Sequence, residues 1–216
     1  MDKETKLKIK IADASASRYI ENNRFTIQSL AQQLDIEPSV IFGHFPNRSA
    51  ILDYFYESRL LLFAEDLKQI KGYSDFSLSE KMSNLFYHLI DQFQQHREFV
   101  LLTYKERILS PNCSSGFQKT FVRSLEEIFS ADVQISSTAS LCKGRFLYQS
   151  IFCHFHGLIL FWMNDQSQNY VNSMALIDKW CSLIEEIYYS KIIDRGFDFT
   201  KFLFYQSPFS KMISKS

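Results

Sequence analysis

The sequence predicts an all-α protein in which a small N-terminal unit of three helices precedes a larger helical bundle. Only 6 of the 216 residues are glycine and 4 are proline, which favours long helices over a turn-rich β fold. Hydrophobic residues make up 46% of the chain and aromatic residues 16%, which is too much apolar material for a disordered protein. These apolar residues recur at helical spacing along most of the chain.

The first predicted helix spans about residues 5–22. Leu7, Ile11 and Ala14 recur along it at helical spacing, and Asn22 ends it. Its N-terminal segment is locally basic, and two interpretations of its lysines stay open: a solvated helix start, or a group that contacts DNA phosphates. These lysines are Lys3, Lys6, Lys8 and Lys10.

Residues 25–52 contain the most informative pattern of the chain. Thr26 is a suitable N-cap for a helix of about two turns, because its hydroxyl accepts a bond from a free backbone N–H. Asp35 tolerates a left-handed backbone and can turn the chain, and Pro38 suits the first position of a second short helix. Asn47 can cap a third, longer helix. Two short helices joined by a tight turn form a helix-turn-helix, whose second helix normally enters the DNA major groove.

This segment resembles the DNA-binding domain of the TetR family of transcriptional regulators. The resemblance rests on the run P-S-V-I-F-G-H-F-P-N-R-S-A-I-L, which follows a threonine-capped apolar helix and covers roughly the first quarter of the chain. It implies a DNA-binding domain over residues 1–47 and a ligand-binding and dimerisation domain over residues 48–216. The best-matching positions are Ile41-Phe42, His44-Phe45, Asn47-Arg48 and Ile51-Leu52.

The resemblance also implies which residues contact the DNA backbone. Arg48 stands where the family usually has a lysine at a helix N-terminus, so that the cation and the helix end both meet a phosphate. Thr26 and His44 match backbone-contacting positions. Phe42 replaces a family tyrosine and lacks its hydroxyl donor, and Pro38 stands where a basic residue is usual. The open alternatives are a solvated surface arginine at position 48 and a purely structural cap at position 26.

The groove-facing positions are expected near the start of the second short helix. Ser39 is small enough to let the helix backbone approach the bases, and Gly43 faces the same way. Glu37 lies at the edge, where its carboxylate either accepts a bond from a cytosine amino group or caps the helix. The complete predicted DNA-contacting set is Thr26, Glu37, Pro38, Ser39, Phe42, Gly43, His44 and Arg48.

Four helices are expected between this unit and the last two long helices. A helix over about 48–71 would link the DNA-binding head to the body, with Gly72 as its C-terminal cap. Ser77 and Glu80 form a capping-box pattern that opens a helix to about Gln95. The remaining expected segments are helices over 96–109 and 117–129, a break at 110–112 and a polar loop over 130–138.

Two long helices are expected over about 139–163 and 170–193, and both are apolar on more than one side. The first is apolar nearly all round, and the second carries Cys181 on one face and Trp180 and Leu183 on the opposite face. A soluble helix with two apolar faces must be covered on both, so one of them fits a partner chain. The family resemblance likewise implies a homodimer through these two helices. The alternative is a monomer that covers both faces itself.

The resemblance further implies an effector pocket within the helical body. Aromatic side chains are candidates for its lining, so the implied ligand is apolar or aromatic. The alternative for each candidate is an ordinary place in the core. The candidates are Phe86, Tyr87, Phe93, Tyr104, Phe121, Tyr148, Phe152, Phe155 and Trp162.

No pattern indicates an enzyme, a cofactor or a metal site. The chain has no glycine-rich phosphate loop, no G-x-S-x-G elbow and no H-E-x-x-H motif. His154 and His156 stand on different faces of a helix, which makes them poor joint metal ligands. The cysteines lack metal-like spacing and are read as small buried hydrophobes, with a redox sensor as the alternative. They are Cys113, Cys142, Cys153 and Cys181.

Charge and hydropathy limit where the protein can be located and which partners it can bind. The formal net charge is zero, so any attraction to DNA must come from a local patch. The longest uninterrupted apolar run, Leu158 to Met163, is far too short to span a membrane, and the N-terminus has no apolar stretch of signal-peptide length. A cytoplasmic protein is therefore expected.

The sequence favours a transcriptional regulator over two other classes of protein. The leading hypothesis is a repressor that binds a palindromic double-stranded DNA operator as a homodimer and is released by a small apolar or aromatic effector. The alternative is a helical ligand-binding or interaction protein whose head does not bind DNA, and a helix-rich enzyme comes third. Site selection from random DNA separates the first two, because only the regulator would enrich a palindrome.

Overall fold

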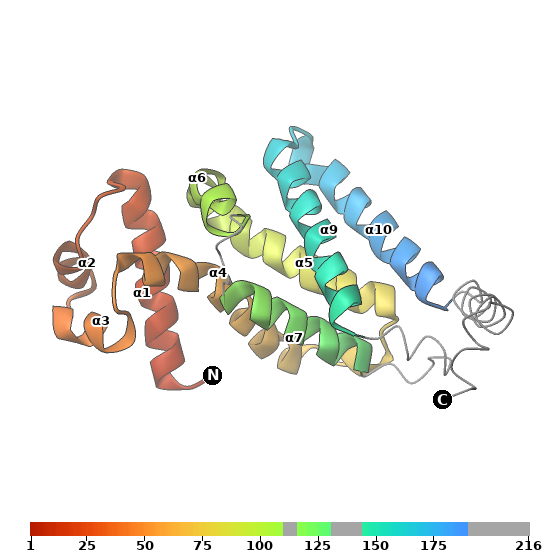
Figure 1. Ribbon diagram of the computed structural model, residues 1–216, viewed down its shortest axis with the longest axis horizontal. Coiled ribbons are helices and arrows are strands. Elements are labelled where there is room, and N and C mark those ends of the chain that lie inside the picture. The colour runs from red at the N-terminus through yellow and green to blue at the C-terminus, as the bar shows by residue number, and fades with distance from the viewer. Residues whose placement is uncertain (110–115, 131–143, 190–216) are drawn as a thin grey trace, which may run out of the picture.

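The computed structural model of the protein describes residues 1–109, 116–130 and 144–189. In this part of the chain the regular secondary structure is helical and contains no strand, which confirms the all-α prediction. Figure 1 shows a small head and a larger body, with α4 running from one into the other. The head contains α1 (Lys3–Glu21), α2 (Ile27–Leu34) and α3 (Pro38–His44).

Local capping and turn residues set the ends of the head helices. The Thr26 hydroxyl accepts a bond from the backbone N–H of Ser29 at 3.1 Å, and the Ser29 hydroxyl oxygen accepts one from the Thr26 N–H at 3.2 Å, which together form a capping box. Asp35 adopts the left-handed conformation, with φ 54°, between α2 and α3. Pro38 occupies the first turn of α3. These features confirm the predicted helix-turn-helix.

The helix α4 (Arg48–Asp66) connects the head to the body. The Asn47 side chain accepts a bond from the Ala50 N–H at 3.0 Å and begins the helix, as the sequence predicts. It packs against α1 in the head and against α5 and α7 in the body. It ends earlier than the expected residue 71, because a 3-10 turn, Leu67–Gln69, follows Asp66. Gly72 has the expected left-handed conformation, with φ 73°, but it precedes a second 3-10 turn, Tyr73–Asp75.

The body is a bundle in which the last helix packs beside α5 and α9. Its first helix opens with the predicted capping box, in which Ser77 and Glu80 exchange side-chain bonds with each other's backbone N–H. Helix α7 packs against α4, α5 and α9 (Figure 1). The expected helical segments 139–143 and 190–193 and the loop 131–138 lie outside the described residues. The body helices are α5 (Leu78–Gln95), α6 (Arg97–Arg107), α7 (Gly116–Ser130), α9 (Arg145–Asn164) and α10 (Val171–Tyr189).

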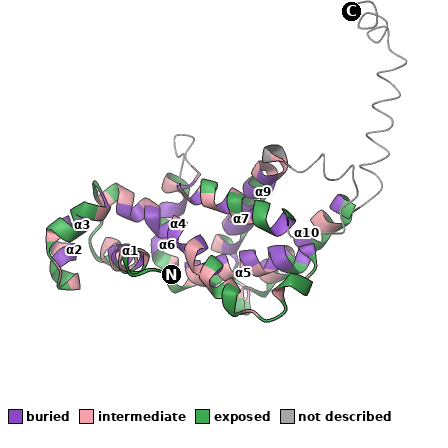
Figure 2. Cartoon of the chain, turned by 90° about the horizontal axis from the view of Figure 1, so that it is seen from below, coloured by how far each residue is buried: buried purple, intermediate pink, exposed green. Residues whose placement is uncertain are grey.

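Buried apolar residues form a single cluster that runs from the head through α4 into the body. Figure 2 shows this cluster as buried segments on the facing sides of the helices, with exposed residues on the outer sides. Its centre in the body is aromatic: the Phe121 ring lies 4.8 Å from that of Phe155 and 5.0 Å from that of Phe152. Tilted aromatic pairs of this kind add stability beyond the apolar area that they bury. None of the described helices is both long and apolar enough to span a membrane.

Candidate nucleic-acid interface and its coupling to the body

Helix α3 presents an uncharged arc to solvent. Ile41 is fully buried and anchors the helix to the head. At about 100° per residue, the opposite side of the helix carries Ser39 and Gly43 in its middle. The flanks of this arc are apolar, since Phe42 and Val40 are 49% and 37% exposed. The two small residues in the middle leave room for the helix backbone to approach a groove closely.

The arc carries few hydrogen-bonding groups. Ser39 contributes one hydroxyl. At the edge of the arc, the exposed N-cap residue Glu37 makes no capping bond with its side chain, which leaves its carboxylate able to accept a bond from a base amino group. Guanine edges are usually read by arginine or lysine, and α3 has neither. Phenylalanine instead packs against the methyl group of thymine. The arc is therefore chemically suited to thymine methyl groups and to one amino group.

Thr26 and His44 both make contacts inside the head. The Thr26 hydroxyl accepts the capping bond described above and still has its own proton to donate. Nδ1 of His44 lies 3.6 Å from a carboxylate oxygen of Glu4, which brings the C-terminal end of α3 beside the start of α1. Lys3 is exposed directly before Glu4, and the Lys8 ammonium lies 5.8 Å from the centre of the ring of Phe45, the C-cap residue of α3.

Arg48 has an intramolecular role that the sequence did not indicate. Its Nη1 donates bonds to the backbone carbonyl oxygens of Asn23, at 2.7 Å, and Phe25, at 3.3 Å. The guanidinium carbon also lies 5.4 Å from the centre of the Phe25 ring. Arg48 thus ties the segment before α2 to the start of α4. Its predicted contact with a DNA phosphate would have to use the remaining guanidinium donors.

The head as a whole is nearly neutral, so its basic surface is local. Residues 1–48 contain seven lysine or arginine residues and six aspartate or glutamate residues. Arg18 pairs with Glu21 at 2.8 Å, and the ammonium of Lys8 lies 4.6 Å from the centre of the Tyr54 ring. The basic side chains of the head that remain exposed are Lys3, Lys6, Lys10 and Arg24.

An ion pair between a buried arginine and a partly exposed aspartate joins the head to the body. Arg59 of α4 is 1% exposed, and its Nη2 donates to the carboxylate of Asp13 on α1 at 2.5 Å. Its Nη1 donates to the Gln92 side chain of α5 at 3.4 Å, and its guanidinium stacks on the Phe55 ring at 4.4 Å. Nε2 of His96 lies 3.8 Å from the same Asp13 carboxylate. A lone arginine within the apolar pattern of residues 51–63 was the only sequence signal for this cluster.

Burial and charge oppose each other at this junction. Burial lowers the pKa of the Arg59 guanidinium, and the Asp13 carboxylate beside it raises that pKa again. Burial also lowers the pKa of His96, against the same carboxylate. The charge of Asp13 therefore stabilises both cationic forms at the contact between α1 and α4.

The nine aromatic residues predicted to line an effector pocket lie in or beside the body core. Eight of them are buried, and the ninth, Tyr87, is half-buried and donates to the Asp178 carboxylate and to the Met174 carbonyl. The Tyr104 hydroxyl bonds Nδ1 of His156 at 2.8 Å, and burial lowers the pKa of this histidine to about 4. The eight buried members are Phe86, Phe93, Tyr104, Phe121, Tyr148, Phe152, Phe155 and Trp162.

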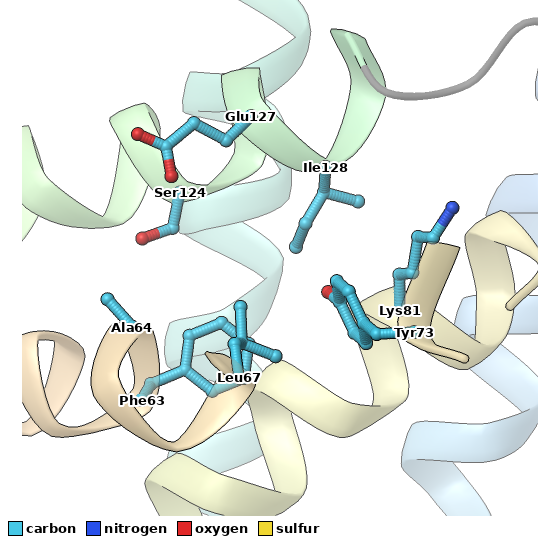
Figure 3. Close-up of a pocket in the computed structure, with 8 residues that line it drawn as sticks. All are labelled: Phe63, Ala64, Leu67, Tyr73, Lys81, Ser124, Glu127 and Ile128. Atoms are coloured by element: carbon cyan, nitrogen blue, oxygen red, sulfur yellow. The ribbon is translucent and has the colours of Figure 1, made fainter. Parts of the chain in front are cut away.

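A cavity of about 210 Å³ lies elsewhere, at the C-terminal end of α4. Its apolar wall comes from Phe63 of α4, Leu67 of the 3-10 turn that follows α4, and Ile128 of α7. Figure 3 shows Tyr73 and Lys81 on one side of this space, with Ser124 and Glu127 on the opposite side. None of the nine predicted aromatic residues lines this cavity. No sequence pattern indicated the cavity, because its polar residues come from three separate segments.

The outer faces of α9 and α10 are apolar and uncovered. Phe161 of α9 is 45% exposed, and Leu183 and Ile187 of α10 are 51% and 49% exposed, whereas Ile177 and Cys181 face the core with no exposure. Gly157, also exposed, has open space around the position of a Cβ atom. Both helices therefore have apolar residues on two sides, as predicted. Trp180, however, was expected on the outer face of α10 and instead packs against the core, with its ring 5.6 Å from that of Phe86.

Of the four cysteines, two lie in the described residues. Cys181 is buried and Cys153 is exposed, and burial raises the pKa of the Cys181 thiol to about 12. Cys113 and Cys142 lie outside the described residues. No group of potential metal-ligating side chains gathers in the part of the chain that the structure describes.

The comparisons with known proteins agree with this architecture. A family model described as "Tetracyclin repressor-like, C-terminal domain" matches residues 81–203, which is more than half of the chain. The chain is similar in structure to the TetR transcriptional regulator from Nitrosomonas europaea ATCC 19718, with a TM-score of 0.58 over 82% of this chain and 96% of that one. The sequence identity is 15%, so this likeness concerns the fold. No curated protein matches the sequence.

A helix-turn-helix head on a helical body defines the class of protein as a helix-turn-helix transcriptional regulator. The family match over the body makes the assignment specific: the chain belongs to the TetR family of transcriptional regulators.

Proposed function

We propose that this protein is a repressor that binds a palindromic DNA operator as a homodimer and releases it when a small effector binds the body. The observation that carries this proposal is the outward arc of α3. Buried Ile41 fixes the helix, while Ser39 and Gly43 leave the opposite side open to a groove. The local basic start of α1 lies beside α3 and can contact the flanking phosphates.

The uncovered faces of α9 and α10 support the homodimer. Large apolar side chains such as Leu183, Ile187 and Phe161 are each close to half exposed on neighbouring helices. Large exposed apolar side chains spread along two neighbouring helices favour an interaction surface in a soluble protein. A second copy of the same two helices would bury it symmetrically, and the resulting two heads would match a palindrome.

Selection from random double-stranded DNA tests the proposal. The full-length protein should enrich a palindromic site, and a DNA fragment carrying that site should be retarded by the protein in a gel. Gly43→Glu should abolish this binding, because it places a carboxylate in the middle of the arc. The space around its Cβ position is open, so the fold should not be disturbed.

Gly43→Ala is the matched control. Alanine also fills the open space but adds no charge, and it favours the helix by about 1 kcal/mol relative to glycine, so specific binding should largely persist. An unenriched library with a folded protein would contradict the proposal and favour the other class, a helical ligand-binding protein whose head does not bind DNA.

A further inference from the structure

The cavity at the end of α4 holds a buried hydroxyl that has no partner. The Tyr73 hydroxyl oxygen is inaccessible to solvent and makes no hydrogen bond within the described residues. Figure 3 shows this oxygen on the side of the ring that faces the cavity. Burial raises the pKa of Tyr73 to about 12, so the hydroxyl keeps its proton and is a donor at neutral pH. An unsatisfied buried donor destabilises the fold, and a ligand acceptor in the cavity would relieve this destabilisation.

A buried cation lies beside the same tyrosine. Lys81 is 4% exposed, and its ammonium donates to the Ser74 carbonyl oxygen at 3.2 Å and lies 6.0 Å from the centre of the Tyr73 ring. No carboxylate of the described residues lies within 4.0 Å of it. Buried lysines are usually paired, because an isolated charge is costly away from water. The side of the cavity with Tyr73 and Lys81 therefore favours a negative, hydrogen-bond-accepting group.

The rest of the cavity favours an apolar body. Phe63, Leu67 and Ile128 supply carbon surface. Glu127, on the opposite side, pairs with Arg123 at 3.1 Å and would repel an anion, so an acidic ligand has only one favourable orientation. The volume of about 210 Å³ is below the range of about 300–1,000 Å³ of drug-sized sites, which limits the ligand to a compact molecule.

We propose that this cavity binds a compact apolar carboxylate, such as a small aromatic or medium-chain aliphatic acid. Its carboxylate accepts a hydrogen bond from the Tyr73 hydroxyl on the side of the cavity that Lys81 flanks, and its apolar part packs between α4 and α7. This site extends the proposed function. Its role as the effector site rests on DNA binding, whereas its binding of the acid does not. The bound acid would contact the C-terminal end of α4. The N-terminal end of the same helix follows α3 in the chain.

Binding is tested on the full-length protein without DNA. Benzoate, phenylacetate and hexanoate at millimolar concentration should raise the melting temperature, whereas toluene, which lacks the carboxylate, should raise it less. Isothermal calorimetry on the best acid should show a Kd at least about 10-fold weaker for Tyr73→Phe, the loss expected for one hydrogen bond to a charged acceptor. Lys81→Met should also weaken binding of the acid, because it removes the positive charge beside the site.

Two controls separate a ligand contact from a structural role. Without ligand, Tyr73→Phe should melt at the same temperature as the parent or higher, because it removes an unpaired buried hydroxyl. Tyr87→Phe removes a hydroxyl that is bonded to Asp178 outside the cavity, so it should lower the melting temperature and leave the Kd unchanged. The proposal is overturned if none of the three acids binds, or if Tyr73→Phe binds the best acid as tightly as the parent. A missing operator would instead overturn the proposed function and leave this binding result unaffected.

Discussion

Replacing Asp13 with asparagine should destabilise the junction between head and body. The change keeps the shape of the side chain and removes the carboxylate that Arg59 bonds at 2.5 Å. Removing one partner of a buried pair costs about 3–5 kcal/mol, but the Asp13 side chain is 36% exposed and solvent screens part of this interaction. Arg59 also keeps the Phe55 carbonyl, the Ser58 hydroxyl and Gln92 as acceptors. We therefore expect a loss of about 2 kcal/mol.

Thermal denaturation measures this loss. For a chain of this size, 1 kcal/mol corresponds to about 2–4 °C, so Asp13→Asn should lower the melting temperature by about 4–8 °C. Glu21→Gln on the same helix is the matched control, because it breaks the exposed pair with Arg18, which is worth at most about 1 kcal/mol. Asp13→Ala combined with Arg59→Met should recover much of the loss, since no buried charge is then left unpaired.

The titration of His96 gives a second readout of the same change. The Asp13 carboxylate raises the pKa of His96 against the effect of burial, so Asp13→Asn should lower that pKa further when it is followed by NMR. An unchanged melting temperature together with an unchanged His96 titration would refute the reasoning, since the carboxylate would then stabilise neither cation.

Three other predictions follow from separate parts of the molecule. Gly157→Glu, at an open position on the exposed face of α9, should convert the dimer to a monomer in analytical ultracentrifugation, whereas Gly157→Ala should not; a dimeric glutamate variant would exclude this face. Replacing thymine by deoxyuridine in the selected operator should weaken binding about fourfold for each methyl group that Phe42 or Val40 contacts. Phe42→Ala should reduce the difference in affinity between the two DNAs. Equal binding of both DNAs by the parent protein would contradict recognition of the methyl groups. Asp165→Asn should lower the melting temperature at neutral pH, because the Asp165 carboxylate accepts bonds from Ser173 and Ser167, which lower its pKa below the usual 3.8. The contribution of this carboxylate to stability is present above pH 3.8 and is lost as the pH falls through the lowered pKa. The melting temperatures of parent and variant should therefore converge in acid.

Local sequence signals were sufficient for most of the fold. The capping residues Thr26, Asn47 and Ser77 each begin a helix at the expected position, because a cap depends on side chains within three residues of it. The end of α4 was less predictable. Apolar spacing continued past Asp66, but the chain tightens into a 3-10 turn there, and no proline or glycine marks the change until Gly72.

The candidate sites were less predictable, because they depend on contacts between distant segments. Arg48 was expected at a phosphate, but its bonds to the carbonyl oxygens of Asn23 and Phe25 depend on how the chain closes over more than twenty residues. Likewise, Tyr73 and Lys81 line a cavity only because residues of α4 and α7 form the rest of its wall. The aromatic residues predicted as pocket lining share their helical spacing with core residues, and spacing alone does not distinguish the two roles.

The size of the cavity limits how an effector could regulate the head. Shifting a two-state equilibrium from 1:99 to 99:1 requires about 5.5 kcal/mol of difference between the affinities for the two states. A ligand with a Kd of about 0.1 mM supplies only about 5.5 kcal/mol of binding free energy in total. A compact acid in a cavity of about 210 Å³ could therefore switch the protein fully only if nearly all of its binding energy were specific to one state. It follows that the two states must be close in energy before the ligand binds.

The ion pair between Arg59 and Asp13 is well placed to set the energy difference between the two states, since it joins α1 of the head to α4. Asp13→Asn should then change the effector concentration that releases half of the operator, in addition to lowering stability. A titration of operator binding with benzoate, run on the parent and on this variant at a temperature where both are folded, would measure the shift. Equal midpoints would indicate that the junction is structural and that α4 transmits the signal by another route.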